Sequence, residues 1–213
     1  MSLFRLDASI RIDGSHSREI ADTVEAAWRE TNPDAPVTRR HIGLEPVPAT
    51  AWADSVSAGQ TPAEKWSDGQ RAARALATAI VDELVAADAL LFAVPLYNYG
   101  VSQHFKTYTD LAITDPRLAA GVPPAIAGKP AVLVTVRGGG YGAGTPREGW
   151  DHATPYTRRV LADLWQLDLK VVEAEFTLAG ENPALADFRD LAAQLRAEAE
   201  SSAREHGRSL SRV

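Results

Sequence analysis

Two nearly unbroken apolar runs, residues 89–94 and 130–136, limit most strongly how this chain can fold. Neither contains a charged residue, which is typical of strands buried on both faces of a parallel sheet. Further strands are predicted at residues 3–8, 37–42 and 170–178. Because a sheet with two apolar faces needs a covering layer on each, the segments between the strands are expected to supply helices.

Segments with helical spacing alternate with these strands. Ile20, Val24 and Trp28 recur at intervals of four, and the Thr61-Pro62 pair is a helix-start signal. Helices are predicted over residues 15–29, 61–87, 102–113, 154–167 and 183–201, with a long connection at 43–60 and a frayed polar tail at 202–213. The alternation predicts an α/β fold: a flavodoxin-like doubly wound five-stranded parallel sheet of order 2-1-3-4-5, with helices on both faces. We expect a single domain over residues 1–213.

Composition narrows the possible functions. The 213 residues include no cysteine, which excludes disulfides, thiolate catalysis and cysteine-ligated metals, so redox chemistry would need a bound organic cofactor. A net charge of −6 argues against a nucleic-acid or anionic-membrane partner. No apolar run approaches the ~20 residues of a membrane helix, and Arg5 and Asp7 interrupt any secretory segment. We therefore expect a cytoplasmic protein. The histidines show no metal-binding spacing, so no metal site is expected.

The loop after the first strand carries Ser9, Ser15 and Ser17, close to the start of the first helix. The first backbone N–H groups of a helix lack partners within it, and the helix dipole favours an anion there. Hydroxyl groups and free amides could together bind a phosphate, and His16 could add a donor. The alternative is simple helix capping, for which serine is common.

The loops after the third and fourth strands have a different character. Pro95-Leu96-Tyr97-Asn98-Tyr99 offers flat apolar surface and amide groups where open α/β sheets hold ligands. The glycine-rich segment 137–145 lets backbone N–H groups approach a ligand and stabilise charge on a reduced flavin. The alternatives are aromatic packing for the first loop and a flexible surface loop for the second. The dinucleotide-type spacing Gly138-x-Gly140 follows the fourth strand and opens no helix, so we reject a dinucleotide fingerprint.

Together these loops resemble those of the FMN-dependent NADH-azoreductases, also described as NADH:quinone oxidoreductases, over about residues 3–200. The resemblance implies a homodimer with FMN at the subunit interface, NADH as electron donor, a quinone or azo compound as acceptor, and a ping-pong cycle. It implies no catalytic side chain, because the flavin carries the chemistry. The FMN-binding residues that it implies are Ser9, Ser15, His16, Ser17, Pro95, Leu96, Tyr97, Asn98, Tyr99, Val136, Arg137, Gly138 and Gly139.

The sequence departs from the family pattern near the expected acceptor pocket. The family often has glutamine at the position of His16, a small polar residue at that of Val136 and histidine at that of Tyr141. Residues 160–165 replace an aromatic- and glycine-containing stretch that lines the acceptor pocket in relatives. Tyr141 and Trp165 are therefore the residues expected to line this pocket here.

Two other functions fit the same fold. One is a flavodoxin-type electron carrier without small-substrate turnover, and the other is a binding module that has lost its cofactor. Carriers are usually more acidic, and the long connection with Trp52 favours an enzyme. The presence of all three loops favours a bound flavin.

Overall fold

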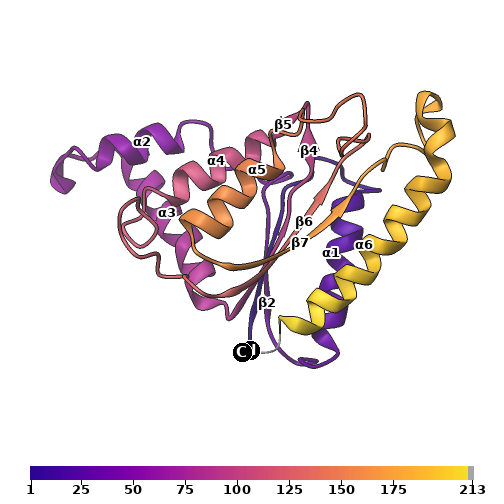
Figure 1. Ribbon diagram of the computed structural model, residues 1–213. Helices are drawn as coiled ribbons and strands as arrows, with labels where there is room; N and C mark the ends of the chain where they lie inside the picture. Colours follow the sequence, from indigo (N-terminus) through magenta and orange to yellow (C-terminus); the bar gives the residue numbers. More distant parts are fainter. Residues whose placement is uncertain (211–213) are drawn as a thin grey trace.

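The computed structural model describes residues 1–210 and contains an open parallel sheet at its centre (Figure 1). Its strands lie in the order β2-β1-β3-β6-β7. Their bounds are Leu3–Asp7 for β1, Val37–His41 for β2, Ala89–Ala93 for β3, Pro130–Val136 for β6 and Asp168–Ala174 for β7. Counted within this sheet, the order is 2-1-3-4-5, so the predicted fold class is confirmed.

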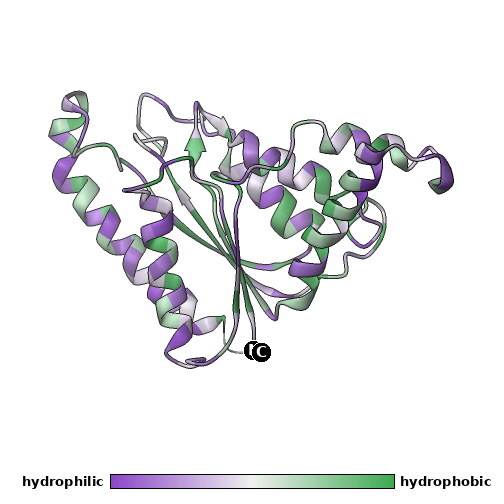
Figure 2. Ribbon diagram, turned by 180° about the vertical axis from the view of Figure 1, so that it is seen from behind, coloured by the Kyte–Doolittle hydropathy of each residue, from purple (hydrophilic) through white to green (hydrophobic). Residues whose placement is uncertain are grey.

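Helices cover both faces of the sheet. One layer holds α1 (His16–Arg29) and α6 (Arg189–Ser209), and the other holds α3 (Asp68–Ala86), α4 (Gln103–Ala112) and α5 (Thr154–Arg158) (Figure 1). Because side chains alternate along a strand, Leu91 packs toward the layer of α1, whereas Leu90 and Phe92 pack toward that of α3. Figure 2 shows apolar residues concentrated along the sheet and on the helix faces toward it. No helix within residues 1–210 is both long enough and apolar enough to cross a membrane.

The prediction for residues 43–87 was partly wrong. The expected connection contains a helix, α2 (Ala51–Ala58), and the expected helix at 61–87 is divided into a 3-10 turn (Ala63–Lys65) and α3. The start of α3 is fixed by a capping box, in which Ser67 Oγ accepts from the Gln70 N–H (3.2 Å) and Gln70 Oε1 accepts from the Ser67 N–H (2.8 Å). This reciprocal cap sets the start of the long helix, so Thr61-Pro62 begins only a short turn.

The C-terminal prediction also needs correction. Residues 183–188 form a 3-10 helix and α6 continues to Ser209, so residues 202–209 are helical rather than frayed. Ala203, Gly207 and Leu210 are buried there. A Cβ on Gly207 would lie 2.3 Å from the carbonyl oxygen of Val24, so glycine permits the close approach of α6 to α1. Residues 211–213 of the predicted tail lie outside the described residues.

The last strand and the preceding helix are shorter than predicted. α5 gives way to a π-helical segment at Arg159–Leu164, and β7 ends at Ala174 rather than at residue 178. Beyond β7 the chain turns toward the glycine-rich loop, where the Phe176 N–H donates to Gly139 O (3.2 Å). This turn brings residues 176–178 beside the candidate site.

Candidate functional site

A cavity of about 130 Å³ lies at the carboxyl ends of β1, β3 and β6. It opens between β1 and β3, where the strand order reverses, which is the ligand-binding position of doubly wound sheets. We call it the serine cavity. Its lining residues are Ser9, Arg11, Ser15, His16, Ser17, Pro95, Leu96, Tyr97, Val136, Gly138, Thr177 and Leu178.

The hydroxyl side of the serine cavity is formed by the start of α1. Ser15 is the N-cap, and its Oγ accepts from the Arg18 N–H (3.4 Å) and lies 3.3 Å from Ser17 Oγ. Ser9, Ser15 and Ser17 are all buried. Thus Ser15 does cap the helix, as the alternative interpretation expected, yet the three hydroxyl groups also face one cavity beside the first-turn amides.

His16 adds a polar atom without a partner. Its Nε2 is buried and has no hydrogen-bond partner within residues 1–210, although it lies 3.9 Å from a carboxylate oxygen of Glu181. Buried polar groups are normally satisfied, so this donor site on the cavity wall fits an anionic ligand group. The other ring nitrogen, Nδ1, lies 3.5 Å from Glu19.

The apolar side of the serine cavity comes from the loop after β3. Pro95 and Leu96 line it with Tyr97, whose hydroxyl group lies 3.2 Å from Ser9 Oγ and accepts from the Ile10 N–H (3.2 Å). Tyr97 therefore ties the third-strand loop to the first-strand loop. These bonds bring together two segments that are 87 or more residues apart in the chain.

A hairpin that the sequence analysis missed carries Asn98 and Tyr99. β4 (Leu96–Tyr97) pairs antiparallel with β5 (Gly100–Val101), and the two linking residues have φ of 48° and 66°. Positive φ at both positions indicates a type I′ turn, for which asparagine at the first position is a recognised signal. Both turn residues are exposed and lie outside the lining of the serine cavity.

The glycine-rich loop contributes only part of its predicted residues to the serine cavity. Val136 and Gly138 line it together with Thr177 and Leu178. A Cβ on Gly138 would lie 2.7 Å from Leu178 Cδ1, so the absent side chain makes room for the leucine. Sequence reasoning missed Thr177 and Leu178 because they were expected to lie in a strand. It also missed Arg11, which pairs with Glu181 (3.1 Å).

Arg137 and Gly139 lie outside the lining of the serine cavity. The buried Arg137 guanidinium pairs with Asp151 (2.7 Å), Glu175 (2.8 Å) and Glu173, and it faces another cavity of about 580 Å³. Burial opposes its charge, but the carboxylates outweigh this effect and hold the pKa of Arg137 above its ordinary value. Gly139 is also buried, and a Cβ there would lie 2.7 Å from Nη1 of Arg147.

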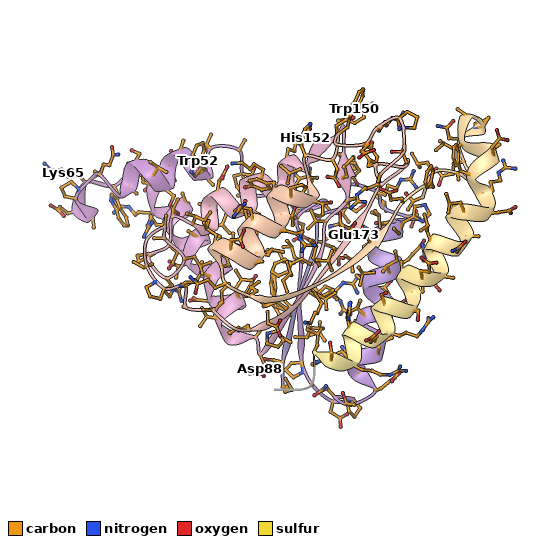
Figure 3. The ribbon with its side chains drawn as sticks, viewed as in Figure 1. Trp52, Lys65, Asp88, Trp150, His152 and Glu173 are labelled. Atoms are coloured by element: carbon orange, nitrogen blue, oxygen red, sulfur yellow. The ribbon has the colours of Figure 1, made fainter. Side chains whose placement is uncertain are left out.

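The two residues expected at the acceptor pocket have different surroundings. Tyr141 lies edge-on to Tyr99 with 6.2 Å between ring centroids, and the Trp150 ring lies edge-on to Tyr99 at 5.5 Å. Figure 3 shows Trp150 at the same end of the sheet as the loop after β3, opposite Asp88. Trp165 is fully buried, 6.4 Å from Phe92 in the core, so its packing does not support a role as a pocket wall.

Fold and site together define a flavodoxin-like α/β protein, and comparison with known proteins agrees. The flavodoxin-like fold family matches residues 1–199. An FMN-dependent NADH:quinone oxidoreductase from Frankia casuarinae is 42% identical over 204 residues, covering 95% of this chain and 96% of the relative. Its namesake from Frankia alni is also 42% identical, over 206 residues, covering 95% and 97%. The chain therefore belongs to the family of FMN-dependent NADH:quinone oxidoreductases, as the resemblance indicated.

Solved structures support the fold. An azoreductase from Bacillus anthracis strain Sterne superposes with a TM-score of 0.78 at 18% identity, covering 98% of this chain and 99% of that one. An FMN-dependent NADH-azoreductase from the Ames Ancestor strain, solved in complex with FMN, gives 0.75 at 14% identity and covers 97% and 100%. At these identities the similarity shows the shared fold alone.

Proposed function

We propose that this protein is an FMN-dependent oxidoreductase that moves a hydride from NADH, through the flavin, to quinones and azo compounds. Family membership supports the cofactor and the activity. The structural observation that carries the proposal is the serine cavity. In it, three buried hydroxyl groups and His16 Nε2, which has no hydrogen-bond partner within residues 1–210, adjoin the start of a helix at the sheet's switch point.

The residues present fit FMN by their chemistry. Ser9, Ser15, His16 and Ser17 would hold the phosphate, since hydroxyl groups and first-turn amides can bind an anion without a basic side chain. Residues 95–99 and 136–139 would surround the ring system, and the members of these ranges that line the serine cavity are Pro95, Leu96, Tyr97, Val136 and Gly138. When bound, FMN supplies hydride acceptance and donation. The side chains then bind, orient and shield, and no protein acid or base is needed.

We further propose a homodimer, because the serine cavity of one chain is too small to enclose the flavin. The serine cavity of about 130 Å³ is well below the ~300–1,000 Å³ of typical ligand sites. A second chain would cover the ring at the open end of the sheet. The helix α2 projects from the body and exposes Trp52 and Val56, which gives an apolar surface for this contact (Figure 3). A ping-pong cycle fits a single open face that the donor and the acceptor use in turn. We also propose that the protein is a single domain and that it is cytoplasmic.

The first test is the visible absorbance spectrum of the freshly purified protein, with mass identification of any released small molecule. We expect a flavin spectrum and the mass of FMN. NADH oxidation is then followed with 2-methyl-1,4-naphthoquinone and with an azo dye as acceptors. If the protein binds FMN and turns over with neither acceptor, the enzymatic proposal fails.

An anaerobic titration with NADH separates the enzyme from an electron carrier. The enzyme should bleach its flavin stoichiometrically with NADH, and added quinone should restore the colour after NADH is exhausted. A carrier should accept no hydride directly. Reoxidation that requires NADH and quinone to be present together would contradict the ping-pong cycle.

A further inference from the structure

Another cavity borders the glycine-rich loop and is larger than the serine cavity. We call it the phenylalanine cavity; it measures about 310 Å³ and is lined mainly by Gly140, Arg147, Phe176, Leu185 and Phe188. This volume falls within the range of small-molecule sites, about 300–1,000 Å³. None of these five residues lines the serine cavity.

The two cavities are lined by neighbouring residues of the same two segments. Beyond β7 the chain runs along the glycine-rich loop, with the Leu178 N–H donating to Gly138 O and the Phe176 N–H to Gly139 O, both at 3.2 Å. Leu178 lines the serine cavity, whereas Phe176 lines the phenylalanine cavity. A ligand in the phenylalanine cavity would therefore contact the loop that also borders the serine cavity.

Phe176 is held in a conformation that a phenylalanine rarely adopts. Its φ is 55°, and its ring lies so close to Gly140 that a Cβ there would be 2.2 Å from Phe176 Cζ. Non-glycine residues in the left-handed region persist only where their surroundings fix them, and they cluster at ligand sites. The ring stacks on Phe188 with centroids 4.8 Å apart at 15°, yet Phe188 is still 41% exposed. The two rings form an aromatic wall, and part of the Phe188 ring remains accessible to a ligand.

Arg147 supplies a positive charge to the lining of the same cavity. It forms no ion pair with any residue from 1 to 210, and its guanidinium lies 6.0 Å from the Tyr99 ring centroid and 5.9 Å from that of Tyr141. Nearby carboxylates are engaged elsewhere, since Glu148 accepts from the Gly144 N–H (2.8 Å) and Glu175 accepts from Arg137 (2.8 Å). The aromatic faces and a hydrogen bond with Tyr141 hold the cation in place, and its remaining N–H groups can bind an anion.

We propose that the phenylalanine cavity binds a planar aromatic anion, with the ring against Phe188 and its acidic group on Arg147. Aryl sulfonates and aryl carboxylates share this chemistry. A flat ring matches the stacked wall, and an oxyanion matches a guanidinium that lacks a carboxylate partner. The inference goes beyond the proposed function, because binding here requires neither NADH nor an electron acceptor.

The test is isothermal titration of FMN-saturated protein with naphthalene-2-sulfonate, and in a second arm with naphthalene-2-carboxylate. We expect saturable binding of one molecule per chain. The neutral analogue naphthalene-2-sulfonamide should bind about tenfold more weakly, because it forgoes a charge-assisted hydrogen bond. The arm with tighter binding identifies the preferred acidic group.

Variants assign the binding to this cavity. Arg147→Gln should weaken sulfonate binding about tenfold and leave sulfonamide binding unchanged, because only the charge is lost. Phe188→Ala should weaken both ligands. Phe188→Leu keeps the apolar bulk without the flat face, and comparison of its melting temperature with that of Phe188→Ala separates lost stacking from lost folding. Arg204→Gln, an exposed cation on α6, should change neither affinity.

Two results would overturn the proposal. One is the absence of saturable binding of both acids. The other is binding that Arg147→Gln and Phe188→Leu both leave unchanged, since the ligand would then lie elsewhere. The readout is heat of binding rather than NADH oxidation. Failure here therefore leaves the proposed oxidoreductase activity standing, and an inactive enzyme could still bind the acids.

Discussion

Two regions border the serine cavity, the β1–α1 corner and the β6–β7 corner, and different kinds of contact stabilise them. At the β1–α1 corner, the cap joins Ser15 to Arg18, three residues along the chain. At the β6–β7 corner, Arg137 reaches Glu173 and Glu175, which are 36 and 38 residues away. The first corner follows from local helix geometry, whereas the second forms only when distant strands come together. We therefore expect substitution of the serines at the first corner to affect mainly ligand binding, and substitution of Arg137 at the second to affect mainly stability.

The largest effect on stability is expected for Arg137→Met. This substitution leaves Asp151 and Glu175 without their cation in a poorly solvated place, and removing one partner of a buried ion pair costs about 3–5 kcal/mol. Urea unfolding at pH 7 should show this loss. The control is Arg159→Met, which breaks the exposed pair with Asp163 and should cost about 0.5 kcal/mol or less. Equal losses in the two variants would show that the Arg137 pairs contribute no more than an exposed ion pair.

The same variant should change how stability depends on pH. Burial would raise the pKa of Asp151, but hydrogen bonds from Thr154 and the charge of Arg137 outweigh it and hold the pKa below its usual value. A lowered pKa in the folded state stabilises the fold above the unfolded value of about 3.9, and the contribution is lost as pH falls through the folded value. The difference between wild type and Arg137→Met should therefore shrink below about pH 4. A difference that stays constant down to pH 3 would contradict this assignment.

At the β1–α1 corner, Ser17→Asp should damage ligand binding rather than folding. A carboxylate at this buried position would repel the phosphate of FMN and replace a donor with an acceptor. Loss of a hydrogen bond to a charged group costs about 1.5–3 kcal/mol, so FMN affinity should fall about a hundredfold or more. Ser17→Ala, which removes the donor without adding charge, should lose about tenfold. Fluorescence quenching of added FMN measures both, and unchanged affinity in Ser17→Asp would refute the phosphate site.

Gly138→Ala tests how closely the glycine-rich loop packs against Leu178. The new Cβ would lie 2.7 Å from Leu178 Cδ1, so the leucine, which lines the serine cavity, must shift. We expect about 1 kcal/mol of destabilisation from overpacking and about fivefold weaker FMN binding. Gly142→Ala is the matched control, because its Cβ would meet Glu175 at an ordinary 3.6 Å. If both variants bind FMN equally well, Leu178 does not limit the cavity.

Sequence reasoning found the strands and the serine-bearing helix start because both follow from local patterns, and the alternation of strands with helices gave the sheet order. Apolar runs mark β3 and β6, and Ser15 is an N-cap in sequence as well as in structure. Residues that reach the serine cavity through long-range packing were missed, as with Leu178, which lies there because β7 ends early and the chain turns back. Burial of Trp165 against Phe92 likewise results from long-range packing, which the sequence around residue 165 does not specify.

The smallest expected effect concerns the link between the two halves of the cavity, which Tyr97→Phe would remove. The Tyr97 hydroxyl lies 3.2 Å both from Ser9 Oγ and from the backbone nitrogen of Ile10, so the variant leaves an amide without its partner at a half-exposed site. We expect a loss of about 1 kcal/mol, which corresponds to about 2–4 °C in melting temperature for a chain of this size. If FMN phosphate takes over these donors, saturating FMN should restore most of the loss. If the variant lowers the melting temperature equally with and without FMN, the Tyr97 hydroxyl group only stabilises the contact between the two loops.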